Sequence, residues 1–285
     1  MNYRHAYHAG NFADVMKHAV LCRVITHLRA KPGAFRVIDT HAGAGVYDLR
    51  GTEAGKTLEW RDGIGRLMHA ELEAPVRALL APYLDAVAAL NPNGALAVYP
   101  GSPALARSLL RSQDRLIACE LEPQAAAALA RELGGDVRTK AVAIDGWTAL
   151  NAYVPPKERR GLVLIDPPFE QGEEYSRLSQ GLAAAHRKWP TGQYLVWYPI
   201  KAASEVAAFV RKLARSRIAK MLRVELIVTS SAAETGLRGS GLIVVNPPWT
   251  LHEELKVLLP ALARLLSRNA TYKTTSEWIA GELSH

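Results

Sequence analysis

The stretch FRVIDTHAGAG (35–45) decides the fold of this chain. Its first half is a short, mostly apolar run that ends at Asp39, as expected of a buried strand, and a glycine-rich turn follows directly. Gly43 and Gly45 would let the backbone of that turn approach a ligand closely. A plain tight turn would use the same residues, so the stretch predicts a ligand site only with support from the rest of the chain.

Further strands follow, and the spacing between most of them leaves room for a helix. These segments are RLIACELEP (115–123), VRTKAVAIDGW (137–147), GLVLIDPPF (161–169) and QYLVWYPI (193–200). Strands that alternate with helical stretches predict a parallel sheet with helices on both faces. The last two strands, MLRVELIVTS (221–230) and GLIVVNPPW (241–249), lie too close together for a helix between them and predict an antiparallel hairpin at one edge. This is the pattern of the class I, Rossmann-like methyltransferase fold, which belongs to the α/β class.

Helical segments surround these strands. Residues 11–29 carry apolar side chains at helical spacing and end at a Lys-Pro-Gly break. Another helix is expected near residue 102, with Ser102 as its N-cap and Pro103 in its first position. Residues 251–268 have an amphipathic pattern that predicts a last helix, and the tail from 269 is left unassigned.

A long interruption separates the glycine-rich turn from the helix near Ser102. Residues 46–98 are mostly helical in pattern and are punctuated by prolines. We therefore predict a Rossmann-like methyltransferase domain formed by residues 1–45 and 99–285, with a small helical subdomain, 46–98, inserted into it.

The composition excludes several classes of protein. Of the 285 residues 49% are hydrophobic, but no apolar run approaches the roughly 18–20 residues of a membrane span. The N-terminus lacks the apolar stretch of a secretory signal, and Cys22 and Cys119 show no metal-binding spacing. The sequence predicts a cytoplasmic protein without membrane association or a metal site. The net charge of +8 favours a polyanionic partner.

Acidic side chains end several of the predicted strands. Ligands of open α/β sheets collect at the carboxyl ends of the strands, which is where Asp39, Glu120, Asp145 and Asp166 fall. Glu120 would suit the ribose hydroxyls of a cofactor, and Asp145 the amino group of its adenine. A dinucleotide is disfavoured as the ligand, because Asp48 stands where the GxGxxG motif has its last glycine.

The motif IDPPF (165–169) indicates the chemistry. The N6 amine of adenine is a weak nucleophile because its lone pair is delocalised into the ring, and an acceptor beside its hydrogens would favour the pyramidal form. Asp166 can supply a carboxylate and Pro167 a carbonyl, held in place by the two prolines. Phe169 would stack on a base flipped out of its helix or loop. The motif predicts methyl transfer to an adenine amine by positioning and electrostatics, with no metal required.

Two other stretches resemble functional motifs. NPPW (246–249) repeats the pattern of the first motif, but an antiparallel strand would place it on the rim opposite the cofactor. GTEAGKT (51–57) resembles a phosphate loop, but it has three residues between its glycines where the motif needs four, and it follows no strand. We expect neither to form the site.

With these motifs in place, the chain resembles the bacterial RlmJ (YhiR) family, which methylates adenine N6 in 23S ribosomal RNA. The resemblance runs almost end to end and is carried, in order, by YRHAYHAGNFADVMKH (3–18), DTHAGAG (39–45), YPGSP (99–103), IDPPF (165–169), LVWYP (195–199) and SGLIVVNPPW (240–249). It implies S-adenosylmethionine as the cofactor and 23S ribosomal RNA, protein-free or early in assembly, as the partner. We expect the protein to act as a monomer.

The resemblance also implies roles for individual residues. Asp166 is implied to be the catalytic acceptor, and Tyr3 falls in the N-terminal motif that the family uses near the target adenine. Phe169 stands where the family commonly has tyrosine, which retains stacking but loses any hydrogen bond from a hydroxyl. Cofactor contacts are implied for His18, His41, Ser102, Glu120, Asp145, Gly146 and Asp166.

Two other functions stay open at this point. A DNA adenine-N6 methyltransferase would use the same chemistry, although the chain leaves no room for a base-reading domain beyond the insert. A non-catalytic RNA-binding assembly factor could keep the fold, but the intact Asp166, Glu120 and Asp145 argue against a loss of activity.

Overall fold

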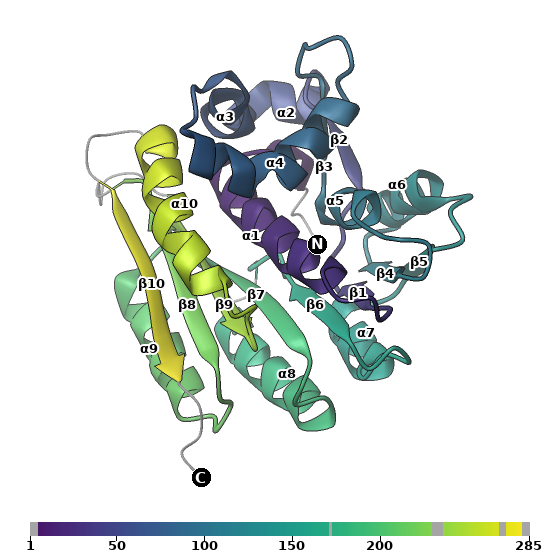
Figure 1. Ribbon diagram of the computed structural model, residues 1–285, viewed down its shortest axis with the longest axis vertical. Coiled ribbons are helices and arrows are strands. Elements are labelled where there is room, and N and C mark those ends of the chain that lie inside the picture. The colour runs from purple at the N-terminus through teal and green to yellow at the C-terminus, as the bar shows by residue number, and fades with distance from the viewer. Residues whose placement is uncertain (1–4, 171–172, 230–235, 268–271, 281–285) are drawn as a thin grey trace.

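A mixed eight-stranded sheet forms the centre of the computed structural model, which describes residues 5–170, 173–229, 236–267 and 272–280 (Figure 1). The strand order is β10-β8-β9-β7-β6-β1-β4-β5. The five neighbours from β7 to β5 are parallel, so their carboxyl ends share one rim of the sheet. Their bounds are β1 Arg36–Asp39, β4 Arg115–Glu120, β5 Thr139–Ala143, β6 Gly161–Ile165 and β7 Gln193–Ile200. The predicted acidic strand ends therefore gather on one rim.

The other three strands are antiparallel to their neighbours. β9 (Gly239–Val245) pairs with β7 and with β8 (Met221–Ile227), which confirms the predicted hairpin. The β8–β9 hairpin does not form the edge of the sheet as predicted, however, because β10 (Lys273–Ala280) pairs with β8 and is the edge strand. The tail could not be assigned from its sequence because this strand is mostly polar and has no buried residue, so it lacks a clear apolar pattern.

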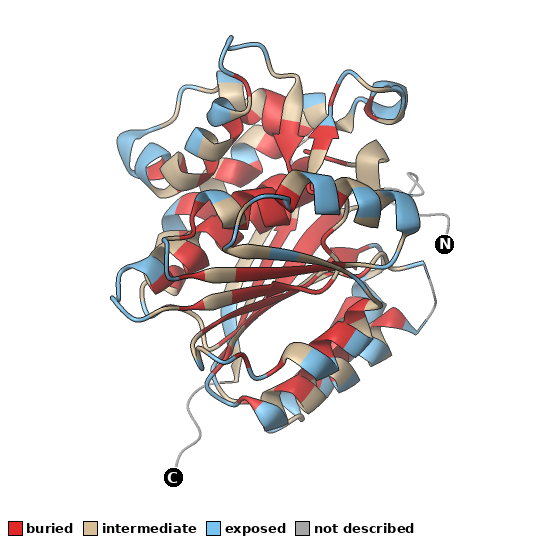
Figure 2. Ribbon diagram, turned by 90° about the vertical axis from the view of Figure 1, so that its right-hand side faces the viewer, coloured by how far each residue is buried: buried red, intermediate tan, exposed pale blue. Residues whose placement is uncertain are grey.

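Helices cover both faces of the sheet, so the chain has the expected class I, Rossmann-like α/β fold (Figure 2). Side chains of four helices pack on one face: α1 Phe12–Arg29, α5 Ser102–Ser108, α6 Pro123–Leu133 and α10 Leu251–Leu266. Three helices pack on the other face: α7 Gly146–Tyr153, α8 Glu174–Lys188 and α9 Ala203–Ala214. None of the helices described has the length and apolar composition to cross a bilayer.

The insert, residues 46–98, begins and ends in a two-stranded ribbon. β2 (Val46–Asp48) pairs antiparallel with β3 (Val98–Pro100), a feature too short to predict from the sequence. The expected helices are confirmed: α2 Thr52–Thr57, the wider helical turn η2 Arg61–Gly65, α3 Arg66–His69 and α4 Ala74–Ala89. The GTEAGKT segment thus forms α2. The division of the chain into two domains stays a prediction, since side chains of α4 and α1 belong to one buried cluster.

Helix α1 lies between the sheet and the insert, and three of its polar side chains, Asp14, Lys17 and His18, are buried together with its apolar ones (Figure 1). The Asn11 side chain caps it by accepting hydrogen bonds from the N–H groups of Ala13 and Asp14. Asp14 and Lys17 are each less than 5% exposed. Buried charges need partners, and the partners of these two residues define the site.

Candidate active site

A cavity of about 1320 Å³ opens at the carboxyl ends of the parallel strands. Its walls come from the amino-terminal segment, the glycine-rich turn and the loops that follow β4 to β7. Tyr3 lies outside the described residues, so its place near the substrate stays a prediction. The other predicted site residues all line the cavity: His18, His41, Ser102, Glu120, Asp145, Gly146, Asp166, Pro167 and Phe169.

Glu120 holds the glycine-rich turn in place at the end of β4. Its Oε2 accepts a hydrogen bond of 2.8 Å from the Gly43 N–H, and its Oε1 accepts bonds from Leu121 and Glu122. Gly43 and Gly45 have φ values of +63° and +87°, in the left-handed region that side chains disfavour. Because a carboxylate offers about four lone-pair positions, Glu120 can still accept from the hydroxyls of a ligand.

The loop after β5 approaches the glycine-rich turn so closely that only glycine fits. A Cβ on Gly146 would lie 2.3 Å from the carbonyl oxygen of Thr40 and 2.5 Å from Nε2 of His41. Asp145 caps α7 by accepting from the N–H and the hydroxyl of Thr148 through Oδ1. This capping fixes a carboxylate and the amino-terminal end of a helix at the cavity wall.

Two neutral imidazoles line the same cavity. The Thr40 hydroxyl donates to the Leu164 carbonyl and so accepts from Nδ1 of His41, which leaves Nε2 of that ring unprotonated. Burial lowers the pKa of His41 to about 4 and that of His18 to about 3. His18 is held by a hydrogen bond of 2.7 Å between its Nδ1 and the Tyr99 hydroxyl. Both rings are therefore uncharged at neutral pH.

Ser102 does not cap α5 as predicted. The cap is Gly101, whose N–H donates to the Gly45 carbonyl and where a Cβ would lie 2.9 Å from that oxygen. This close approach to the glycine-rich turn moves the helix start to Ser102 and places Pro103 second. The Ser102 hydroxyl instead donates to Asp39 Oδ2 at 2.6 Å. Burial raises the pKa of Asp39 to about 7.

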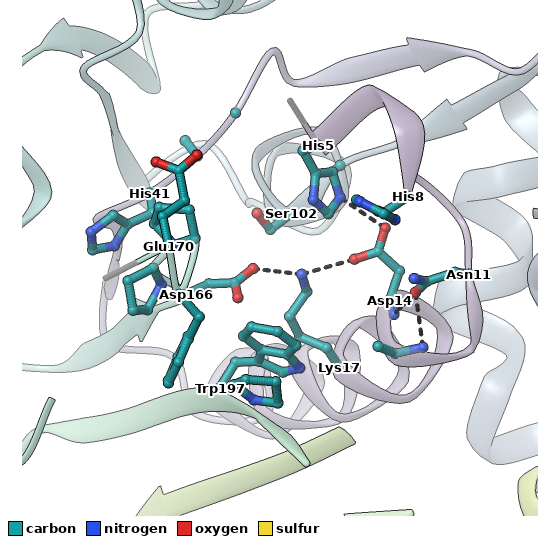
Figure 3. Close-up of a pocket in the computed structure, with 18 of the residues that line it drawn as sticks. His5, His8, Asn11, Asp14, Lys17, His41, Ser102, Asp166, Glu170 and Trp197 are labelled. Carbon is teal, nitrogen blue, oxygen red and sulfur yellow. Dashed lines mark hydrogen bonds and ion pairs between the residues drawn. The ribbon is translucent and has the colours of Figure 1, made fainter. Parts of the chain in front are cut away.

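A chain of buried charges runs from the amino-terminal segment to the DPPF motif (Figure 3). Lys17 Nζ lies 2.5 Å from Asp166 Oδ2 and 2.8 Å from Asp14 Oδ1. Asp14 Oδ2 in turn accepts from Nε2 of His5 and from the Gly10 N–H, both at 2.9 Å. The Oδ2 oxygen of Asp166 is thus occupied, while its Oδ1 has no hydrogen bond to any described residue.

Lys17 and Asp14 are both ionised at neutral pH. Burial alone would lower the pKa of Lys17, but the carboxylates of Asp14 and Asp166 raise it above its ordinary value. Burial would also raise the pKa of Asp14, yet the interactions with His5 and Lys17 hold it well below its usual range. Lys17 was not predicted from the sequence as a site residue. The signal was there, since Asp14 and Lys17 stand three residues apart on a helix that is otherwise mostly apolar.

The DPPF loop ends in a strained aromatic residue. Phe169 has a φ of +51°, a left-handed conformation that is unusual for a bulky side chain and stores backbone strain. Its ring makes edge contacts with Tyr175 and Trp197, with centroids 5.0 and 5.7 Å apart. Trp197 also lies 5.9 Å from Lys17 Nζ. Phe169 and Trp197 therefore form an aromatic wall beside Asp166.

The second motif, NPPW, lies on the opposite rim, as predicted. β9 runs antiparallel to β7, so Asn246 leaves the sheet at the end away from the cavity. Its Nδ2 donates to the carbonyl oxygens of Pro190 and Gly192, both at 2.8 Å. These bonds connect two loops, which gives Asn246 a structural role. Within the described ranges, no group of three or more His, Cys, Asp or Glu side chains is arranged to hold a metal ion.

Comparison with known proteins identifies the family. Residues 32–280 match the family described as "Ribosomal RNA large subunit methyltransferase D, RlmJ". The chain is 39% identical to ribosomal RNA large subunit methyltransferase J of Escherichia coli, over 99% of this chain and 100% of that protein. The protein of the same name from Haemophilus influenzae is 38% identical, with the same coverage. A crystal structure from Legionella pneumophila, 35% identical, superposes with a TM-score of 0.87 over 97% of this chain and 99% of that one. The chain therefore belongs to the RlmJ family of large-subunit ribosomal RNA methyltransferases.

Proposed function

We propose that the protein transfers a methyl group from S-adenosylmethionine to the N6 amine of an adenine in 23S ribosomal RNA. The observation that carries this proposal is that one cavity is lined by both sets of residues. Glu120, Asp145 and Gly146 are suited to bind a nucleoside, and Asp166 and Pro167 are suited to accept hydrogen bonds from an amine. The relatives named as ribosomal RNA large subunit methyltransferases support RNA as the substrate.

The residues present fit S-adenosylmethionine. The close packing of Gly146 against Thr40 and His41, and the hydrogen bond from the Gly43 N–H to Glu120, hold the backbone of the cavity wall in one arrangement. Glu120 would hold the ribose hydroxyls and Asp145 the adenine amine, and the other residues proposed to contact the cofactor are His18, His41, Ser102, Gly146 and Asp166. When bound there, the cofactor supplies an electrophilic methyl group.

Asp166 and Pro167 act on the amine that receives the methyl group. The Oδ1 of Asp166 and the Pro167 carbonyl accept hydrogen bonds from the two N6 hydrogens, which turns the nitrogen lone pair towards the methyl group. Lys17 holds the other oxygen, Oδ2, and keeps the carboxylate in one orientation. The new N–C bond would form as the methyl–sulfur bond breaks, with the electron pair staying on sulfur. The nitrogen would become positive, and Oδ1 of Asp166 is placed to take its surplus proton.

The aromatic wall is the place where the target base would lie. Phe169 and Trp197 line the cavity next to Asp166, and stacking on such rings holds a base that has left its helix or loop. Tyr3, in the amino-terminal motif, is proposed to contact the same base.

A methyl-transfer assay with labelled S-adenosylmethionine tests the function. Protein-free 23S RNA, assembled large subunits, 16S RNA and duplex DNA would be compared, followed by digestion to nucleosides. We expect label in N6-methyladenosine from protein-free 23S RNA alone, because the acceptor pair fits an adenine amine and the family acts on large-subunit RNA. Label in DNA would favour a DNA adenine methyltransferase. No label with any substrate, together with no heat on addition of S-adenosylmethionine, would favour a binding protein.

Glu120→Gln is expected to weaken cofactor binding. The amide would place an N–H₂ group against backbone N–H donors that now face a carboxylate, and it would accept more weakly from ribose hydroxyls. Hydrogen bonds to a charged group are worth about 1.5–3 kcal/mol, which corresponds to about a 10- to 100-fold rise in Kd. Calorimetry with S-adenosylmethionine measures this effect. An unchanged Kd in a variant of unchanged melting temperature would remove Glu120 from the cofactor site.

A further inference from the structure

Side chains of the insert, above all the carboxylate of Glu59, form hydrogen bonds with the amino-terminal segment. Glu59, between α2 and η2, accepts from Nδ1 of His8 at 3.0 Å and from Nδ2 of Asn11 at 2.9 Å (Figure 3 shows His8 and Asn11). The hydroxyl of Thr57 donates to the carbonyl of Tyr7, the last residue of the short helix η1 (His5–Tyr7). Side chains of the insert thus form hydrogen bonds with both the last residue of η1 and the N-cap residue of α1.

Backbone contacts make this junction tight. The Ile64 N–H donates to the Gly10 carbonyl at 2.8 Å, and a Cβ on Gly63 would lie 2.1 Å from that oxygen. Gly10 itself has a φ of +76° and no room for a side chain against Ile64. The η2 turn and the backbone at Gly10 are therefore packed so closely that neither can shift relative to the other without a clash or the loss of this hydrogen bond.

The amino-terminal segment is connected to the proposed acceptor carboxylate, Asp166, by a series of side-chain contacts. His5, at the start of η1, donates to Asp14, Asp14 pairs with Lys17, and Lys17 pairs with Asp166. His5, His8 and Glu59 also line the cavity. A shift of η1 would consequently alter both the shape of the cavity and the partners of the buried charges.

We propose that Glu59 is a positioning residue for methyl transfer, which acts through His8 and Asn11 to hold the amino-terminal segment against the active site. This inference rests on the proposed function and gives the insert a task within it. The segment held by Glu59 leads through His5 and Asp14 to Lys17 and Asp166, not to Glu120, Asp145 or Gly146, so loss of Glu59 should reduce turnover more than cofactor binding. Misplacement of reacting groups by about 1 Å can cost about 100-fold in rate.

The charged groups around His8 make the interaction between His8 and Glu59 depend on pH. His8 faces Glu59 from the insert, Asp14 from α1 and Lys201 from the loop after β7. Its hydrogen bond to Glu59 raises the pKa of His8 above its ordinary value of 6.5. A raised pKa in the folded state means that the His8–Glu59 ion pair contributes fully at low pH and is lost as the pH rises through the pKa of His8.

Glu59→Gln tests the proposal because it keeps the size of the side chain and removes its charge. We expect kcat with 23S RNA to fall about 10-fold or more, with the Kd for S-adenosylmethionine within about 2-fold of the wild type. The ratio of wild-type to variant kcat should be larger below the raised pKa of His8 than above it, where His8 is neutral in both proteins. In a His8→Gln background the same substitution should have a smaller effect, which a double-mutant cycle measures.

Controls separate this result from simpler effects. Glu71→Gln removes an exposed carboxylate elsewhere in the insert and should leave kcat unchanged. A pH-independent loss of activity with a lowered melting temperature would show that Glu59 is merely structural, and wild-type kcat in Glu59→Gln would overturn the proposal. If the wild-type protein itself transfers no methyl group to RNA, the proposed function fails, whatever the variant does.

Discussion

Replacement of Asp166 by alanine is expected to lower methyl transfer to 23S RNA by at least about 10²- to 10³-fold, the size of effect seen when one pre-organised transition-state contact is lost. The proposed acceptor for the adenine amine disappears with the carboxylate. Asp14, the other carboxylate paired with Lys17, cannot replace it because its second oxygen already accepts from His5 and the Gly10 N–H. Labelled methyl incorporation under single-turnover conditions measures this loss, and circular dichroism checks that the fold remains.

Asn246→Ala is the matched control, because it alters the corresponding residue of the second motif on the opposite rim. It removes hydrogen bonds to the Pro190 and Gly192 carbonyl oxygens and places alanine at a φ of +50°, so stability should fall modestly. Its methyl transfer should stay near the wild-type rate. Loss of activity in Asn246→Ala together with an active Asp166→Ala would transfer the catalytic role to the second motif.

Lys17→Met is expected to lower the free energy of unfolding by about 3–5 kcal/mol at neutral pH, since it leaves buried carboxylates without their common cation. Asp14 would keep His5 and the Gly10 N–H, while Asp166 would lose the partner that fixes its orientation. Activity should therefore fall along with stability. Urea unfolding and the transfer assay measure the two effects.

The stability loss in Lys17→Met should depend on pH. In the wild type the pKa of Asp14 is held well below its usual range, so its favourable contribution is present above the ordinary Asp pKa and is lost in strong acid. In the variant the unpaired carboxylates destabilise the fold only while ionised, so the difference from wild type should narrow as the pH falls towards about 4. Lys256→Met, which removes an exposed lysine paired with Glu253, should change stability by less than about 0.5 kcal/mol. An equal loss in both variants would contradict the buried-charge argument.

The main features of the fold could be predicted because they depend on local pattern. Apolar runs such as 161–165 and 193–200 are long enough to identify strands, and their spacing implies the parallel order. β10 and the β2–β3 ribbon escaped prediction because an edge strand and a three-residue strand carry little hydrophobic signal. Ser102 was misplaced by one position because its neighbour Gly101 packs against Gly45, a contact between segments far apart in sequence.

Among the site residues, too, those marked by a local sequence pattern could be predicted, and those that depend on long-range contacts could not. Glu120, Asp145 and Asp166 could be placed on one rim because each follows a recognisable strand. Lys17 and Glu59 could not, since their importance depends on what lies beside them after folding. The partner of Lys17 is 149 residues away, and Glu59 meets His8 across 51 residues.

The distance in sequence between Lys17 and Asp166 has a consequence for synthesis of the protein. The ribosome releases helix α1, with its buried acid and base, long before β6 and the DPPF loop exist. Central strand β1 must likewise wait for both of its neighbours, β4 and β6. Contacts of such long range form slowly. A nascent chain that ends before residue 166 therefore lacks the proposed acceptor carboxylate and leaves Lys17 without its partner on that side, so we expect methyl transfer to begin only late in translation.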